Sequence, residues 1–181
     1  MALVPVFDLD GTLIDSDAAL AAPFVALGVD PADVTYGHVL ADECRRLGIA
    51  VADYLAVYDP TAAAPYPGVG ELVDALDRWA VCSNKHGASG RAELARLGWS
   101  PTAALFADAF GGPKRLGPVL DALDLAADEI VFVGDTHHDR RCAQEVGARF
   151  ALAGWNPRAR AGARPEDLLL DAPGDLLALL D

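Results

Sequence analysis

The sequence predicts an α/β fold in which a doubly wound parallel sheet carries a short helical segment inserted after its first strand. Three observations point to this fold. Short apolar runs alternate with helix-like segments through the second half of the 181-residue chain, which is typical of a parallel sheet covered by helices on both faces. An early apolar run, residues 3–7, ends abruptly at Asp8. Between these regions, residues 16–68 show only helix-like and irregular patterns.

The first part of the chain predicts one strand and a helical insert. Residues 3–7 are uniformly apolar and end at an acidic, Gly-containing loop, which indicates a buried strand. Helix-prone composition and spacing predict three helices after it. A stretch with two prolines and no periodicity then predicts a hinge. The predicted helices cover residues 18–27, 34–47 and 51–58, and the hinge covers residues 61–68.

Strand-like and helix-like segments alternate regularly from residue 69 onward. Apolar runs predict four further strands, and periodic segments predict five helices, several of which end at a glycine. The clearest strand pattern, Ile-Val-Phe-Val, covers residues 130–133. The predicted strands are 79–82, 105–110, 130–133 and 150–152, and the predicted helices are 69–76, 88–97, 118–125, 138–146 and 175–180.

Charge and composition exclude several classes of function. The formal net charge is −13, from 14 basic and 27 acidic side chains. No basic stripe for nucleic acid or for an anionic membrane is present. No uncharged apolar stretch reaches the roughly 18 residues of a transmembrane helix, and the first residues do not resemble a secretory signal. We therefore expect a cytoplasmic monomer or homodimer with no membrane or nucleic-acid partner. The three cysteines are too scattered for a disulfide framework or zinc site and are predicted to be buried; they are Cys44, Cys82 and Cys142.

Polar residues follow three predicted strands at the point where each strand ends. Because the carboxyl ends of parallel strands meet at one edge of a sheet, we expect these side chains to lie close together. A single Asp in such a position is usually a helix cap, but four acids, a serine and a lysine at one edge indicate a site. The residues are Asp8 and Asp10, Ser83 and Asn84, Asp135 and Asp139, with Lys114 in a loop.

The chemistry of this set is that of phosphoryl transfer with a divalent cation. Clustered carboxylates repel one another and do not all ionise without a cation, and Mg²⁺ suits carboxylates combined with a substrate phosphate. With the charge neutralised, Asp8 can act as a nucleophile. Asp10 can protonate the leaving oxygen and then deprotonate a water. Ser83 and Lys114 can contact phosphate oxygens.

Four motifs in order resemble those of the haloacid dehalogenase-like phosphohydrolase superfamily. Residues 8–16, DLDGTLIDS, match the first motif, DxDGT. Ser83 and Asn84 match the second, Lys114 is the candidate for the third, and residues 134–139, GDTHHD, match the fourth, GDxxxD. The stretches VCSNK, PYPGV and VFVGDTHHD are most similar to the phosphoglycolate phosphatase-like branch of this superfamily.

This resemblance implies a domain organisation and an activity. It implies a Rossmann-like core formed by residues 1–15 and 69–181, and a small helical cap with its hinge, residues 16–68, that closes over the substrate. The implied enzyme is a hydrolase, a Mg²⁺-dependent phosphatase that acts on a phosphate monoester of a small phosphorylated metabolite through an aspartyl-phosphate intermediate.

The resemblance also implies a role for each matching residue. Asp8 would be the nucleophile and a metal ligand, and Asp10 the general acid and base, with its backbone carbonyl on the metal. Asp135 would ligate Mg²⁺ through its side chain. Asp139 would hold the metal's waters or orient the catalytic Lys114. The residues implied to hold phosphate oxygens are Thr12, Ser83 and Asn84.

Two assignments stay open. The branch usually places its third-motif lysine just before a proline, whereas here Pro113 precedes Lys114. The only other lysine is Lys85, directly after the second motif; we favour Lys114. In the cap, three side chains either belong to a solvated helix face or contact an anionic leaving group; they are His38, Arg45 and Arg46.

Two other functions are compatible with parts of the pattern. A sugar phosphomutase of the same superfamily shares the core motifs, but a short cap is poorly suited to keep water away from an aspartyl-phosphate. A non-enzymatic phospho-acceptor or binding module also places acids and a lysine around a parallel sheet. Such a module needs neither Asp10 as a proton donor nor a helical insert.

Overall fold

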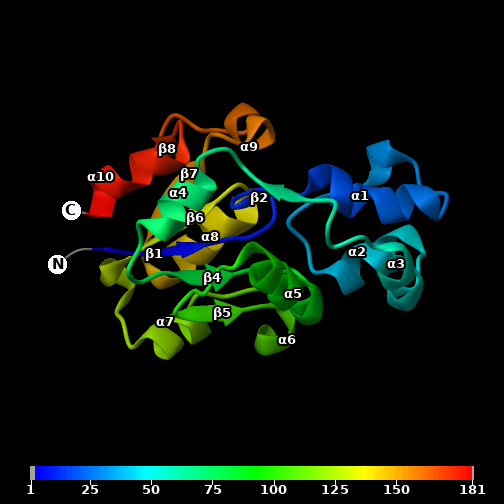
Figure 1. The fold of residues 1–181 in the computed structure, drawn as a ribbon, viewed down its shortest axis with the longest axis horizontal. Coiled ribbons are helices and arrows are strands. Elements are labelled where there is room, and N and C mark those ends of the chain that lie inside the picture. Colours follow the sequence, from blue (N-terminus) through cyan, green and yellow to red (C-terminus); the bar gives the residue numbers. More distant parts are fainter. Residues whose placement is uncertain (1–2, 181) are drawn as a thin grey trace.

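The structure, a computed structural model, describes residues 3–180. Its centre is a six-stranded sheet in which every neighbouring pair is parallel, so the predicted α/β fold with a parallel sheet is confirmed (Figure 1). The two central strands, β1 and β6, pair in register from Val4 opposite Ile130 to Phe7 opposite Val133. The order across the sheet is β5 (Ala103–Leu105), β4 (Ala80–Cys82), β1 (Val4–Phe7), β6 (Ile130–Gly134), β7 (Arg149–Ala153) and β8 (Leu169–Leu170).

Helices cover both faces of this sheet because successive strand residues point to opposite sides. Phe7 and Val133 belong to a core cluster on one face, whereas Val6 and Phe132 belong to a cluster on the other. All four side chains are fully buried. The first face is covered by α4 (Val69–Asp74), α5 (Gly87–Leu97), η3 (Pro173–Leu176) and α10 (Leu177–Leu180), and the second by α6 (Ala107–Phe110), α7 (Gly117–Leu123) and α8 (His137–Val146).

The insert, called the cap below, lies beyond the end of the sheet toward which the strand arrows point (Figure 1). It contains a small apolar cluster of its own, with Phe24 and Tyr54 in contact, 4.6 Å between ring centroids. A two-stranded antiparallel ribbon joins it to the core, formed by β2 (Ile14–Asp15) and β3 (Ala64–Pro65). The boundaries at residues 15/16 and 68/69 stay a prediction. The cap elements are α1 (Asp17–Ala26), η1 (Pro31–Asp33), α2 (Leu40–Leu47) and α3 (Val51–Val57).

The helix predicted over residues 34–47 is wrong in its first half, because α2 begins only at Leu40. Gly37 has a φ of +85°, in the left-handed region that a continuing helix does not use. Thr35 donates from its backbone N–H and its hydroxyl to Glu43 Oε1, at 2.7 and 3.0 Å. These bonds fold residues 34–39 back along the start of the helix instead of extending it.

The strand predicted over residues 105–110 is also wrong in position. The strand β5 ends at Leu105, which pairs with Cys82, the last residue of its neighbour β4. A longer β5 would therefore have no strand to pair with. The Ala107 N–H donates instead to the Lys85 carbonyl, 3.1 Å away, and α6 follows. The predicted hinge likewise contains the short strand β3, and the last predicted helix is divided into η3 and α10.

The sequence patterns predicted neither α9 (Pro157–Ala161) nor four shorter elements. The strands β2 and β8 have two residues each, and η1 and η2 (Ala127–Glu129) are single 3₁₀ turns. Elements of this length are too short to show a periodic apolar pattern.

The three cysteines are unpaired and buried, as predicted. Among the described residues, no helix combines the length and apolar character that a bilayer-spanning segment requires.

Candidate active site

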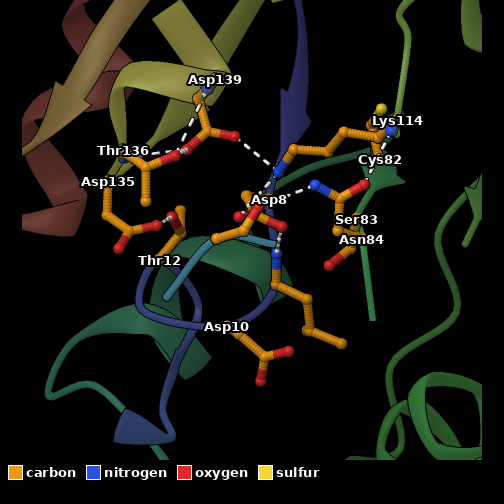
Figure 2. Close-up of polar contacts among 12 residues, drawn as sticks. Asp8, Asp10, Thr12, Cys82, Ser83, Asn84, Lys114, Asp135, Thr136 and Asp139 are labelled. Atoms are coloured by element: carbon orange, nitrogen blue, oxygen red, sulfur yellow. Dashed lines mark hydrogen bonds and ion pairs between the residues drawn. The ribbon is translucent and has the colours of Figure 1, made fainter. Parts of the chain in front are cut away.

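The carboxyl edge of the sheet positions the predicted acids. Asp8 follows β1, and its N–H donates to the Val133 carbonyl at 2.9 Å, which extends the β1–β6 pairing one step past the strand. Asp135 follows the neighbouring strand β6, and Asp139 lies in the first turn of α8. Figure 2 shows that these three carboxylates and the Lys114 side chain converge on one small volume.

Lys114 lies between two of these acids. Its Nζ is 2.8 Å from Asp8 Oδ2 and 2.6 Å from Asp139 Oδ1, and all three side chains are almost fully buried. The loop that carries the lysine is fixed on both sides. The Lys114 N–H donates to Asn84 Oδ1 at 2.7 Å, and its carbonyl accepts from Cys142 Sγ at 3.2 Å. The structure thus places Lys114, despite its shift relative to Pro113, against the predicted nucleophile.

The three acids form a group that fits a divalent cation. Asp8, Asp135 and Asp139 each offer one carboxylate oxygen, and these oxygens lie within 4.8 Å of one another. Burial raises the pKa of Asp8 to about 6; the positive charge of Lys114 opposes this rise and the negative charge of Asp139 adds to it. A buried site with more carboxylates than cations is stabilised by a hard, oxygen-preferring ion such as Mg²⁺.

The other two acids of this group differ in their surroundings. Burial, together with the charges of Asp139 and Asp8, raises the pKa of Asp135 well above its usual value. Burial acts in the same direction on Asp139, but the charge of Lys114 and hydrogen bonds from Lys114 and Thr136 outweigh it and lower the pKa of Asp139. Asp139 is therefore the carboxylate that the protein alone holds ionised most firmly, whereas burial disfavours the ionised forms of Asp8 and Asp135.

Local backbone geometry at the fourth motif requires its glycine. A Cβ on Gly134 would lie 2.3 Å from the Asp139 Cβ, so no other residue fits there without a shift of the acid. Asp139 is held in this close position by Thr136, whose N–H and hydroxyl donate to Asp139 Oδ2 at 2.9 and 2.6 Å. The Thr136–Asp139 pair also caps α8.

Asp10 lies apart from the three-acid group, and Figure 2 shows its carboxylate on the far side of Asp8 from Asp139. Its partner is the second lysine. Lys85 Nζ is 2.8 and 3.2 Å from the two Asp10 carboxylate oxygens and 3.2 Å from Glu93 Oε2. Tyr58 of the cap accepts from Lys85 at 3.1 Å and donates to Glu93 Oε1 at 2.6 Å. Each lysine of the chain thus contacts one of the two predicted catalytic carboxylates.

The electrostatics of Lys85 favour its charged form. Burial by itself would lower the pKa of this ammonium, but the carboxylates of Asp10 and Glu93 outweigh burial and raise it above its usual value. Lys85 and Glu93 are both nearly inaccessible to water. The Asp10 carboxylate is therefore held by a lysine that stays protonated.

The predicted phosphate-binding residues already make contacts within the protein. The Thr12 hydroxyl donates to Asp135 Oδ1 at 3.0 Å, and Ser83 Oγ accepts from the Lys85 N–H at 3.2 Å. The Asn84 side chain donates to the Gly37 carbonyl in the cap at 2.8 Å. All three predicted residues lie at the site edge (Figure 2), and Asn84 also joins the Lys114 loop to the cap.

The three cap side chains left open by the sequence are placed differently from one another. Arg45 is 75% exposed and pairs with Asp42 at 2.7 Å. Arg46 pairs with Glu43 at 2.6 Å. Neither arginine lines the cleft between cap and core, whereas His38 does.

Several residues beyond the predicted catalytic, metal and phosphate-binding set contact the site. Arg158 Nη2 donates to Asp135 Oδ2 at 2.7 Å, and its Nε donates to Asp17 Oδ2 at 2.8 Å. Asn156 donates to the Gly11 carbonyl at 2.7 Å. Asn156 follows β7, so a fourth polar residue after an apolar strand was an available signal. Two residues on helices or their ends offered no comparable signal; they are Tyr58 and Glu93.

Comparisons with known proteins agree with this arrangement. A family model described as haloacid dehalogenase-like hydrolase matches residues 6–153. The phosphoglycolate phosphatase of Aquifex aeolicus is 32% identical over 98% of this chain and 96% of its own length. The pyrophosphatase PpaX of Bacillus cereus is 37% identical over 38% of this chain and 32% of its own length.

The fold is shared with solved structures at lower identity. A crystal structure of a haloacid dehalogenase superfamily hydrolase of subfamily IA from Geobacter sulfurreducens superposes with a TM-score of 0.78 at 19% identity. The superposition covers 99% of this chain and 100% of that one. The similarity therefore extends over both the sheet and the cap.

Proposed function

This chain belongs to the haloacid dehalogenase-like hydrolase family, and from that premise we propose that it is a Mg²⁺-dependent phosphatase that hydrolyses a small phosphate monoester through an aspartyl-phosphate on Asp8. The observation that carries the proposal is the pairing of the two lysines. Lys114 lies 2.8 Å from Asp8, and Lys85 lies 2.8 Å from Asp10. Lys114 thus places positive charge beside the proposed nucleophile, and Lys85 positions the carboxylate of the proposed acid and base.

In the first half-reaction, an Asp8 carboxylate oxygen attacks phosphorus and the bond to the ester oxygen breaks. The protonated form of Asp10 gives its proton to the leaving oxygen, which departs as a neutral alcohol. This step leaves Asp10 as a carboxylate, the form that the Lys85 ammonium holds. Lys114 supplies positive charge beside the attacked phosphoryl group.

In the second half-reaction, Asp10 takes a proton from a water that attacks the phosphorus of the aspartyl-phosphate. The bond between phosphorus and the Asp8 oxygen breaks, Asp8 returns as a carboxylate, and inorganic phosphate leaves. Asp10 is again protonated, so protons balance over the cycle. Both half-reactions need Asp8, which makes it the least replaceable residue of the site.

The implied metal would be held by the three-acid group. We propose four groups as its protein ligands or as the partners of its waters. They are the side chains of Asp8, Asp135 and Asp139 and the backbone carbonyl of Asp10. When bound, Mg²⁺ supplies charge neutralisation for the buried carboxylates and for the substrate phosphate. Thr12, Ser83 and the Asn84 backbone are proposed to contact phosphate oxygens.

The test is hydrolysis of a chromogenic phosphate ester, p-nitrophenyl phosphate, with and without Mg²⁺. We expect turnover with Mg²⁺, its loss after thorough chelation by EDTA, and its recovery when Mg²⁺ is restored. Turnover that survives chelation would contradict the metal's role. An Asp10→Asn variant is expected to accumulate phosphorylated Asp8, detectable by mass spectrometry after borohydride trapping.

The same assay separates the proposal from its two alternatives. A phosphomutase would return an isomeric sugar phosphate with little free phosphate. A non-enzymatic phospho-acceptor would become labelled on Asp8 without repeated turnover. We expect many equivalents of inorganic phosphate for each equivalent of protein.

A further inference from the structure

The cleft between the cap and the sheet edge holds the space for the part of the substrate beyond the phosphate. Its volume is about 760 Å³, with the open space at its mouth included. The core side of the cleft carries Asp8, Asp10 and Ser83, and the cap side faces them. If the phosphate lies at Asp8, as proposed above, the leaving group must lie against the cap side.

The cap side of this cleft is mostly apolar. Phe24 and Tyr54 belong to the buried cluster of the cap, and the half-buried Leu40 and Leu55 pack against that cluster. An apolar group placed against such a wall is removed from water, which stabilises binding. The apolar and aromatic side chains that line the cleft from the cap side include Leu20, Phe24, Val34, Leu40, Tyr54 and Leu55, together with the tyrosines Tyr36 and Tyr58.

The cationic lysine and arginine side chains on the cleft are already neutralised. Lys85 contacts the carboxylates of Asp10 and Glu93, at 2.8 and 3.2 Å. Arg158 contacts those of Asp17 and Asp135, at 2.8 and 2.7 Å. Each cation therefore has two carboxylate partners within the protein. A carboxylate on the leaving group would have to displace one of them.

The cap adds no unpaired cation to the cleft. Its two acidic lining residues, Asp17 and Glu43, are paired with Arg158 and Arg46, and neither Arg45 nor Arg46 lines the cleft. An anionic leaving group would thus meet carboxylates and apolar side chains without an unpaired lysine or arginine among the described lining residues. Burying a carboxylate in such surroundings is costly.

Two histidines also line the cleft. The ring of His38 packs edge to face against His138, with centroids 4.9 Å apart. His86 Nδ1 is buried and has no hydrogen-bond partner within residues 3–180. A single buried imidazole nitrogen suits one hydroxyl, amide or ring nitrogen on an otherwise apolar group.

We propose that the preferred substrate is the phosphate monoester of an uncharged, largely apolar alcohol, alkyl or aryl, and not of a short carboxylate such as glycolate. This inference rests on the proposed phosphatase function and on the location of the leaving group in this cleft. The Aquifex relative is named a phosphoglycolate phosphatase. The substrate proposed for this chain therefore differs from the one in that relative's name.

The direct test compares phosphoglycolate with isobutyl phosphate, in which two methyl groups replace the two carboxylate oxygens at similar size. We expect kcat/KM for isobutyl phosphate to exceed that for phosphoglycolate by at least about 10-fold, the scale of a mismatched group in a specificity pocket. A series of ethyl, butyl and hexyl phosphate follows. These alcohols are similar leaving groups, so kcat/KM should rise about 2- to 4-fold for each added methylene that the cleft buries.

A pair of variants tests whether the cap side determines this preference. Leu55→Arg places a cation on the cleft wall and is expected to raise the ratio of phosphoglycolate to isobutyl phosphate turnover by about 10-fold. Val57→Arg adds the same charge to α3 at a residue that is 47% exposed and does not line the cleft, and should leave the ratio unchanged. Leu40→Lys provides a second position if Leu55→Arg does not fold.

The outcomes distinguish this inference from the proposed function. Hydrolysis of phosphoglycolate as fast as, or faster than, isobutyl phosphate would overturn the inference and leave the phosphatase assignment intact. A flat response to alkyl chain length would also overturn it. Absence of Mg²⁺-dependent hydrolysis for every ester would instead overturn the proposed function, and the inference with it.

Discussion

The sheet edge and the cap differ in how their side chains are held, although they face the same cleft. At the edge, Asp8, Lys114 and Asp139 are almost completely buried and bound to one another. In the cap, the arginines lie at the surface, and the side facing the cleft is mostly apolar. The edge is a tightly packed set of paired charges, whereas the cap presents a surface that a few substitutions can alter.

Packing explains this difference. The strands β1 and β6 are buried on both faces and carry their acids at a fixed register, so a change at the edge disturbs the whole sheet. The cap relies on a small cluster with few fully buried members, among them Phe24 and Tyr54. Function that depends on rigid placement belongs on the first kind of element, and recognition that varies among relatives belongs on the second.

The largest expected effect comes from the nucleophile on the edge. Asp8→Asn should lower kcat by roughly 10⁴-fold or more, because both half-reactions use this carboxylate. Circular dichroism should show that the variant stays folded. Asp121→Asn, an exposed acid on α7, serves as a control and should keep wild-type turnover. If Asp8→Asn turned over substrate at a rate comparable to that of the wild type, the proposed role of Asp8 as nucleophile would be wrong.

The next effect concerns the lysine beside the nucleophile. Lys114→Ala should lower kcat by about 10²- to 10³-fold, the scale for loss of one electrostatic group at a transition state. Steady-state kinetics on p-nitrophenyl phosphate would measure it. A larger kcat loss in Lys85→Ala than in Lys114→Ala would move the third-motif role to Lys85.

Lys85 lies where the two regions meet, and its removal should affect stability more than chemistry. Lys85→Ala leaves Glu93 buried without its cation, which is expected to cost roughly 3–5 kcal/mol of the free energy of unfolding. Urea denaturation would measure the loss. Adding Glu93→Gln removes the unpaired charge, so the double variant should recover part of the stability. No recovery would show that Glu93 is not the source of the cost.

The smallest effect is a pH dependence confined to the cap. Burial would raise the pKa of Glu43, but hydrogen bonds from Arg46 and Thr35 outweigh it and hold the pKa below its usual value of 4.5. The ionised carboxylate therefore stabilises the cap above about pH 4.5, and this contribution is lost as the pH falls through the lowered pKa.

Hydrogen exchange at pH 6 and pH 3.5, corrected for intrinsic rates, would test this prediction. Residues 34–47 should lose protection at the lower pH to a greater extent than β6. Glu43→Gln should weaken the cap by about 1 kcal/mol at pH 6, because a charged hydrogen-bond network with a half-exposed arginine is partly screened. It should also flatten the pH dependence. Equal loss of protection in both regions would show that the cap does not respond separately.

The sequence by itself determined the parallel sheet, the position of the helical insert and the set of acids at the strand ends. These features follow from local patterns, because an apolar run that ends in Asp indicates both a buried strand and its carboxyl end. The strand over residues 130–133 and the acid that follows it, Asp135, were readable for this reason. The late start of α2 was not, because it depends on the contact between Thr35 and Glu43.

Only the tertiary structure decided which charges meet. The distance in sequence between Lys85 and Asp10, or between Arg158 and Asp135, gives no indication that their side chains pair. The neutralisation of both cleft cations and the apolar side of the cap depend on how two separately packed regions face each other across the cleft. A periodic sequence pattern shows which face of a helix or strand is buried. Which charged side chains pair across a cleft depends on how the whole chain folds.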